Sequence, residues 1–208
     1  MDYLRDPGAI YAQSFATIRA EADLSHLPSA LHHVATRMIH ACGMTDLAAD
    51  IEADPTVVEA ARSALGAGAP ILCDCEMVRS GIIRALLPAD NQLLVTLNDS
   101  VVPELATHLG TTRSAAAVEL WRDRLPGAVV VIGNAPTALF HLLEMLEQWA
   151  PKPAAIIATP VGFVGAAESK ASLAAGGHGV PWLTVRGRRG GSAIASAACN
   201  AIARGPAA

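Results

Sequence analysis

The sequence predicts an α/β protein with a doubly wound, mostly parallel sheet of about five strands and helices on both faces. Two observations lead to this fold class. Short apolar runs alternate along the chain with longer helical patterns, and no repeat, low-complexity tract or long linker divides them. Hydrophobic residues make up 52% of the 208 residues and charged residues only 16%, which provides apolar material for one large core. We therefore expect residues 1–208 to form a single domain.

The strands are expected at five short runs that are apolar on both faces, as buried parallel strands are. These runs are Ile71–Cys73, Leu93–Thr96, Val129–Ile132, Ala155–Ala158 and Trp182–Val185. In a doubly wound sheet the ligand lies at the carboxyl ends of the strands, where the connecting loops converge. Here those loops are Asp74–Arg79, Asn98–Ser100, Gly133–Thr137, Thr159–Gly165 and Arg186–Ser192.

Helical patterns fill the intervals between these runs. Asp6-Pro7 begins the first helix, and a second covers Pro28–Cys42 with Gly43 as its C-cap. A third covers Asp54–Gly66. Later helices are predicted at Val102–Leu109, Arg113–Arg124, Pro136–Trp149, Val164–Ala174 and Ser192–Ala203.

Charge and composition narrow the classes of function. The net charge of −4 argues against general nucleic-acid binding, which needs a basic face. The longest charge-free run, between Arg124 and Glu144, is interrupted by Pro126 and Gly127, so no membrane span is expected. The N-terminus has no apolar signal-peptide core, and the four cysteines form no C-x-x-C pair. A cytoplasmic protein with reduced thiols is therefore expected.

The strongest charge feature lies directly after the last predicted strand, in Val185-Arg186-Gly187-Arg188-Arg189-Gly190-Gly191-Ser192. Guanidinium groups bind carboxylate or phosphate through paired hydrogen bonds, and the N-terminus of the following helix adds positive potential. We interpret the loop as an anion clamp, with Arg186 and Arg188 as candidate ligands of the anion. A solvated basic turn fits the same residues equally well.

A second strand-to-helix turn, Gly133–Thr137, offers a similar site. Asn134 is expected to cap the helix and Pro136 to lie in its first turn, which would leave free N–H groups for an anion. The motif alone favours the simpler interpretation of a well-capped helix. No G-x-G-x-x-G follows the first strand and no G-x-x-x-x-G-K-[ST] occurs, so a dinucleotide or P-loop site is not supported.

Among the seven histidines, His40 is the strongest catalytic candidate. It lies at the end of a predicted helix, and a histidine can exchange a proton near neutral pH. Arg37 lies one turn earlier, so both side chains can face one ligand. A lone histidine on a helix more often serves packing alone. His32 and His33 lie about two turns away, and no H-E-x-x-H or Cys/His quartet occurs, so no metal site is expected.

Several segments distributed over essentially the whole chain carry more specific information. They are Asp6-Pro7-Gly8-Ala9-Ile10-Tyr11 with Ser14-Phe15, Arg37-Met38-Ile39-His40-Ala41, Cys73-Asp74 with Met77-Val78, Thr112-Arg113-Ser114-Ala115, Gly133-Asn134-Ala135-Pro136-Thr137-Ala138-Leu139, Pro160-Val161-Gly162-Phe163-Val164-Gly165-Ala166-Ala167-Glu168-Ser169-Lys170, and the arginine loop Val185–Ser192. In this order and combination they resemble the precorrin-8X methylmutase family. The last three segments are highly specific together.

The resemblance implies an isomerase of cobalamin biosynthesis. Such an enzyme moves a methyl group from C11 to C12 of precorrin-8X and gives hydrogenobyrinic acid, with no cofactor and no metal. His40 matches the family's catalytic histidine, and we expect it to act as a general acid. The resemblance also implies a homo-oligomer, which we expect to be a dimer with shared active sites.

The substrate implied is a large macrocycle with many carboxylates, which fits an acidic protein that carries a local arginine cluster. The residues expected to bind it are Ser14, Arg37, Arg113, Asn134, Thr137, Arg186 and Arg188. The first three match family positions near the bound corrinoid, the next two belong to the matching strand-to-helix turn, and the last two are chosen from charge alone.

Three other functions remain open on the sequence. A corrinoid carrier would keep the binding residues but would not need His40. A cobalt chelatase would require a cluster of His or acidic ligands, which the spacing does not offer. A generic nucleotide-binding domain is disfavoured by the missing phosphate-binding loops.

Overall fold

The computed structural model describes residues 1, 3–148, 150–176 and 178–206. In this part of the chain the central sheet has six strands in the order β1-β6-β5-β4-β2-β3. Strands β2 to β6 run parallel, and β1 pairs antiparallel with β6 at one edge. The strands are β1 (Ile51–Ala53), β2 (Ile71–Cys73), β3 (Leu93–Leu94), β4 (Val129–Ile132), β5 (Ala155–Ala158) and β6 (Trp182–Val185).

The predicted sheet is confirmed and has one further strand. Strands β2, β4, β5 and β6 have the predicted bounds. Strand β3 ends at Leu94 rather than at the predicted Thr96. The Thr96 hydroxyl donates to the carbonyl of Ala117 (2.8 Å) and accepts from Trp121 Nε1 (2.9 Å). The sequence does not predict β1, since a run of three residues with Glu52 at its centre is neither apolar nor long enough to show a period.

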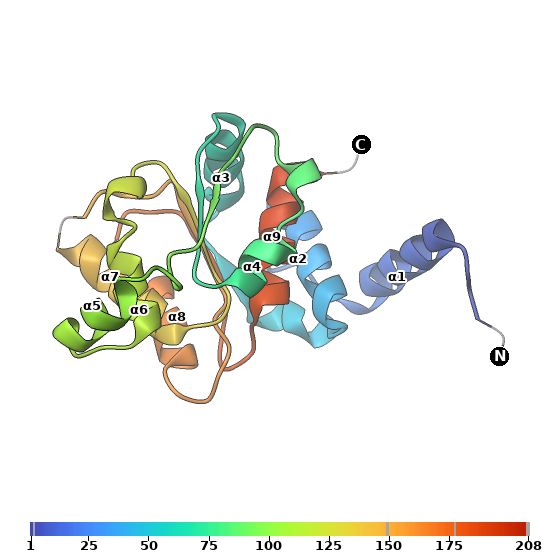
Figure 1. Ribbon diagram of the computed structural model, residues 1–208. Coiled ribbons are helices and arrows are strands. Elements are labelled where there is room, and N and C mark those ends of the chain that lie inside the picture. Colours follow the sequence, from blue (N-terminus) through green and yellow to red (C-terminus); the bar gives the residue numbers. More distant parts are fainter. Residues whose placement is uncertain (2, 149, 177, 207–208) are drawn as a thin grey trace.

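Helices cover both faces of the sheet, as predicted (Figure 1). Helices α2, α3 and α9 pack with Val129 and Val131 of β4 on one face, and α6, α7 and α8 pack with Val130 and Ile132 on the other. The helices are α1 (Pro7–Glu21), α2 (Ser29–Cys42), η1 (Thr45–Asp50), α3 (Val57–Gly66), α4 (Glu76–Gly81), η2 (Arg84–Leu86), α5 (Val102–Leu109), α6 (Arg113–Glu119), η3 (Arg122–Arg124), α7 (Pro136–Glu147), α8 (Ala166–Ala174) and α9 (Ser192–Arg204).

The start of α1 and the end of α2 have the capping residues predicted from the sequence. The Asp6 side chain caps α1 by accepting from the N–H of Ala9 at 2.6 Å, and Pro7 occupies the first helical position. Helix α2 ends at Gly43, whose φ of 69° places it in the left-handed region that suits glycine.

Other boundaries differ from the prediction for local reasons. Helix α3 begins at Val57 rather than Asp54, because the Asp54 carboxylate accepts from the N–H of Thr56 (2.8 Å) in a turn that precedes the helix. Helix α8 begins after Gly165, whose φ of 77° lies outside the helical region, so Val164 is not helical.

Two further predictions need correction. The helix predicted over Arg113–Arg124 is divided into α6 and the short helix η3. The loop predicted over Asp74–Arg79 contains the start of α4. Helix α7 ends at Glu147, and Trp149, the predicted last residue of that helix, lies outside the described residues.

Helix α1 projects from the body of the molecule (Figure 1). Ile18 is its one buried residue, whereas Tyr3, Leu4, Ile10 and Tyr11 expose large apolar side chains along the N-terminal segment. This segment therefore presents an apolar surface to solvent. Within the described residues, no helix combines the length and the apolar character needed to cross a membrane.

A buried carboxylate joins β2 to the turn between β4 and α7. Asp74 is 4% exposed, and its two oxygens accept from the backbone N–H groups of Gly133 (3.0 Å), Asn134 (2.8 Å) and Ala135 (2.8 Å). Burial raises the pKa of Asp74, and these N–H groups oppose that rise. The N–H groups predicted to be free for an anion are therefore satisfied by a side chain of the same protein.

The predicted cap of α7 is consequently wrong. Ala135, not Asn134, is the N-cap residue, and it contributes no side-chain hydrogen bond. Asp74 supplies the acceptor from the neighbouring strand instead. Gly133 is required at this turn, because a Cβ there would lie 2.7 Å from the Cα of Ser192 at the start of α9.

Replacement of Asp74 by asparagine tests this carboxylate. Asp74→Asn puts an amide NH2 where one acceptor oxygen stood, so at least one buried N–H would face another donor. We expect the free energy of unfolding to fall by about 2–4 kcal/mol, measured by urea denaturation at pH 7. Asp123→Asn, at an exposed position in η3, is the control and should change it little. An unchanged midpoint for Asp74→Asn would contradict the assigned role.

Candidate functional site

His40 lies in the last turn of α2 and contacts α1 through Ser14. The Ser14 hydroxyl oxygen lies 2.8 Å from His40 Nδ1. This contact occupies one ring nitrogen and leaves Nε2 without a partner among the described residues. The hydroxyl can accept a hydrogen bond from a protonated Nδ1 or donate to an unprotonated one, so it accommodates both protonation states of the imidazole.

Aromatic side chains of α1 fix the orientation of the imidazole. The Phe15 ring stacks on His40 with centroids 5.0 Å apart and planes at 22°, and the Tyr11 ring lies 5.3 Å away. The Arg37 guanidinium lies over Phe15, 4.6 Å from the ring centroid. Ser14, Arg37 and His40, three of the predicted site residues, are therefore brought together with two aromatic rings.

His40 and Ser14 line a cavity of about 450 Å³ between α1 and α2. Leu4, Ile10 and Ile18 contribute apolar surface to the lining, and Glu21 contributes a carboxylate. A pocket of this size with a few polar groups is typical of a small-molecule site.

The end of α2 lies at the carboxyl edge of the sheet. Ile51, the first residue of β1, is paired with Val185, the last residue of β6, so η1 and the end of α2 that precede β1 lie beyond the carboxyl end of β6. Arg189, in the loop after β6, donates to Asp46 at 2.7 Å and also pairs with Asp50, both in η1. His40 therefore lies at the edge of the sheet where the loops after the strands are predicted to form the site.

The arginine loop is arranged differently from a simple anion clamp. Arg186 pairs with Glu52 of β1, and Arg189 pairs with the two aspartates of η1. Arg188 instead lies 5.5 Å from the ring centroid of Phe163, a residue that is 86% exposed. Two of the three guanidinium groups therefore already have carboxylate partners, and Arg188 keeps its charge available.

Lys170 holds the arginine loop through a buried hydrogen bond. Its side chain is 1% exposed, and the ammonium donates to the carbonyl oxygen of Arg189. Burial lowers the pKa of Lys170 to about 8, and the nearby charge of Asp50 opposes that fall. Gly190 completes the tight packing, because a Cβ there would lie 2.2 Å from the carbonyl oxygen of Thr159.

The remaining predicted residues gather at the starts of α6 and α7. Thr112 and Thr137 share a hydrogen bond between their hydroxyls at 2.8 Å, and Arg113 donates to the carbonyl of Leu97 at 3.2 Å. Asn134 is held through its backbone N–H by Asp74. Asn134 and Thr137 follow β4, whereas Thr112 and Arg113 precede it at the start of α6. Helices α6 and α7 belong to the layer on the face of the sheet opposite α2.

Apart from Arg186 and Arg188 of the arginine loop, the predicted residues form two groups at one edge of the sheet. Ser14, Arg37 and His40 lie on the α1–α2 side, and Arg113 and Thr137 lie on the α6–α7 side (Figure 1). Asp74 and Glu76, two acids separated by Cys75 after β2, lie in different environments. Asp74 is buried under the α7 turn, whereas Glu76 pairs with Arg79 on the surface at 3.0 Å.

Sequence reasoning did not assign roles to Tyr11, Phe15 or Lys170. Tyr11 and Phe15 follow the spacing of one helix face, four residues apart, which is the pattern that brings two rings onto one partner. Lys170, two positions after Glu168 in α8, carries no comparable indication of its partner, which lies in another loop.

Fold and site together define an α/β enzyme architecture with an imidazole as the candidate acid–base group beside a partly apolar cavity. The family model described as precorrin-8X methylmutase matches residues 9–205. The chain belongs to the precorrin-8X methylmutase family, whose members are isomerases.

Individual relatives are similar to this chain over almost its full length. The precorrin-8X methylmutase of Pseudomonas aeruginosa is 62% identical over 98% of this chain and 98% of that protein. The cobalt-precorrin-8 methylmutase of Priestia megaterium is 34% identical over 94% of this chain and 87% of that protein. A crystal structure of the precorrin-8X methylmutase from Thermus thermophilus superimposes with a TM-score of 0.85, at 36% identity and 95% coverage of both chains.

The buried lysine predicts a dependence of stability on pH. The folded-state pKa of Lys170, about 8, lies below the 10.5 of an exposed lysine, so folding releases a proton between these values. The cost of burying the charge is fully present below pH 8 and disappears as the pH rises toward 10.5. Relative to Lys170→Met, the wild-type protein should gain about 3 kcal/mol over this range.

Urea denaturation of both proteins at several pH values between 7 and 10 measures this difference. Lys152→Met, which removes an exposed lysine, is the matched control and should show no such trend. A constant difference between wild type and Lys170→Met at all pH values would show that folding does not lower the pKa of Lys170.

Proposed function

We propose that this protein catalyses the methyl shift from C11 to C12 of precorrin-8X, giving hydrogenobyrinic acid in cobalamin biosynthesis, with His40 as the general acid. The observation that carries the proposal is the imidazole of His40, held by Ser14 at 2.8 Å and by a stacked ring, at the wall of an open cavity. Membership of the methylmutase family supplies the reaction class.

The geometry supports a defined role for each group. In the imidazolium form, Nδ1–H donates to the Ser14 hydroxyl and Nε2–H is directed to the ligand. Protonation of a ring nitrogen by Nε2 redistributes the π-system, the methyl bond to C11 breaks as the bond to C12 forms, and the proton returns to His40. Substrate and product are isomers, so the step balances without an oxidant or reductant.

Arginines would hold the macrocycle through its peripheral carboxylates. Arg37 is close to His40 and free of any carboxylate partner among the described residues. Arg188 and Arg113 are available at the two sides of the sheet edge, with Asn134 and Thr137 as further polar groups. Arg186 contributes less, because Glu52 already neutralises it. Such contacts use remote binding energy to orient the reacting carbons.

The names of the relatives favour a metal-free substrate, and the cysteines favour a cytoplasmic location. Identity is 62% to a relative named for precorrin-8X and 34% to one named for cobalt-precorrin-8. Among the described residues all four cysteines are free thiols, as is typical of a reducing compartment.

A dimer with shared active sites would unite the two groups of site residues. His40 and Arg113 belong to helix layers on opposite faces of the sheet, and α1 extends away from the body with exposed apolar side chains (Figure 1). Packing α1 against a second copy would bury this apolar surface and place the partner's polar groups over His40.

Loss of the imidazole tests the acid role. His40→Ala should lower kcat about 10²–10⁴-fold while hydrogenobyrinic acid still binds, followed by the visible spectra of precorrin-8X and product. Ser14→Ala should lower kcat less, because the imidazole remains. His108→Ala, at an exposed position on α5, should convert substrate like the wild type.

The outcomes of that assay separate the alternatives. Equal conversion by wild type and His40→Ala would remove His40 from catalysis. Binding of the tetrapyrrole without conversion by either protein would indicate a corrinoid carrier instead of an isomerase.

Mixed oligomers test the shared site. His40→Ala and Arg113→Ala chains, each inactive alone, should regain about a quarter of wild-type activity when mixed equally, because some mixed dimers have one intact site. Mixing His40→Ala with Arg37→Ala, two defects in the same group, should restore nothing. Mixed dimers that form, as shown by co-purification through two different tags, but stay inactive would contradict a shared site.

A further inference from the structure

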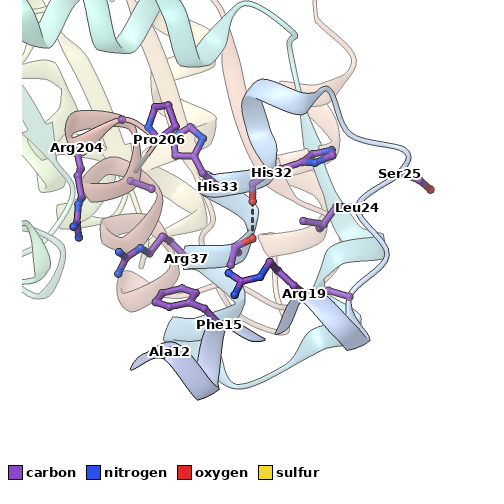
Figure 2. Close-up of a pocket in the computed structure, with 14 residues that line it drawn as sticks. Ala12, Phe15, Arg19, Leu24, Ser25, His32, His33, Arg37, Arg204 and Pro206 are labelled. Atoms are coloured by element: carbon purple, nitrogen blue, oxygen red, sulfur yellow. Dashed lines mark hydrogen bonds between the residues drawn. The ribbon is translucent and has the colours of Figure 1, made fainter. Parts of the chain in front are cut away.

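A second and larger cavity lies beside α2, on the side facing the C-terminal end of α9. Its volume is about 760 Å³. Helices α1 and α2 and the end of α9 form its walls, and Figure 2 shows Arg37, Arg204 and Phe15 around one part of it. The residues of α9 at this cavity do not contact His40 or the other residues of the proposed site in any hydrogen bond or ion pair among the described residues.

The cavity wall carries basic groups without compensating acids. Arg19, Arg37 and Arg204 line it, and no aspartate or glutamate is among its described lining residues. None of these three arginines forms an ion pair within the part of the chain that the structure describes. Arg186 and Arg189 of the arginine loop, in contrast, both have carboxylate partners.

Further positive charge lies behind this wall. The Arg62 guanidinium is close to Gly205, since a Cβ on that glycine would lie 2.9 Å from it. Burial lowers the pKa of His33, and the charges of Arg62 and Arg37 lower it further. His33 Nε2 is buried and has no hydrogen-bond partner in the described residues, although the ring lines the cavity. The site therefore combines unpaired donors with an uncompensated positive potential.

The cavity adjoins the proposed catalytic group through two residues, Phe15 and Arg37. Phe15 lines it and also stacks on His40 at 5.0 Å. Arg37 lines it as well, one helical turn from His40, or about 4.5 Å along the helix axis. A macrocycle that covers His40 can therefore reach this cavity with its peripheral side chains.

We propose that the cavity between α1, α2 and the end of α9 binds peripheral carboxylates of the tetrapyrrole through Arg19 and Arg204. The assignment rests on the proposed function, and it adds two residues that position the substrate without touching the reacting carbons. Unpaired guanidinium groups in a partly apolar cavity are suited to carboxylates, and a fork of two donors fixes their direction.

Single and double replacements of the two arginines test this site. Arg19→Gln and Arg204→Gln should each raise KM for precorrin-8X about tenfold and leave kcat nearly unchanged, because the contact is made equally before and during the reaction. Arg124→Gln, an exposed arginine of η3 far from the cavity, is the matched control and should leave both constants unchanged. Unchanged KM in the double variant would overturn the proposal.

A second measurement separates charge recognition from a general loss of structure. Hydrogenobyrinic acid should bind the double variant more weakly than the wild type in an absorption titration. The same macrocycle with the contacting carboxylates converted to amides should bind both proteins equally. If the amide form also loses affinity in the double variant, the arginines act on the fold and the assignment is wrong.

The experiment distinguishes this proposal from the function on which it depends. If the wild type does not convert precorrin-8X, the proposed function fails. If the wild type converts it and the double variant matches the wild type in KM and in product affinity, the function stands and the carboxylate site fails.

Discussion

The hydrogen bonds that Asp74 accepts from the start of the α7 turn determine how the carboxyl edge of the sheet is built. A helix N-terminus beside parallel strands is a general anion site, and here the protein supplies the anion itself. The carboxylate fixes the turn between β4 and α7 against β2, and Gly133 lets the start of α9 approach the same point. At the α7 turn, ligand binding must therefore depend on side chains, because these three backbone N–H groups are already satisfied.

The arginines also differ in whether they pair with a carboxylate of the same protein. Arg186 and Arg189 connect the loop after β6 to β1 and η1 through carboxylates, and Lys170 holds the same loop from its buried side. These groups shape the edge of the sheet. Arg37, by comparison, has aromatic rings instead of a carboxylate beside it. The structure therefore distinguishes two kinds of basic side chain. Some stabilise the protein through carboxylate partners, and others remain available to a ligand.

The sequence predicts much of the fold because its determinants are local. Strand β4 is a run of β-branched residues between turns, and the Asp6-Pro7 pair and Gly43 mark helix ends by their own conformational preferences. Strand β1 and the partners of Arg186 and Arg189 could not be predicted, because they depend on contacts between residues more than 130 positions apart. The acceptor at the start of α7 could not be predicted for the same reason, because Asp74 lies 60 positions before Asn134.

The position of His40 follows from this same long-range pairing. Strand β1 is antiparallel to β6, so the chain that leads into it, α2 and η1, comes to lie beyond the carboxyl ends of the parallel strands. Without that edge strand, α2 would be one more covering helix and its last turn would have no reason to lie near the ligand loops. The short strand that the sequence pattern does not reveal is therefore what brings the histidine, identified by its family motif, to the edge where α/β proteins bind their ligands.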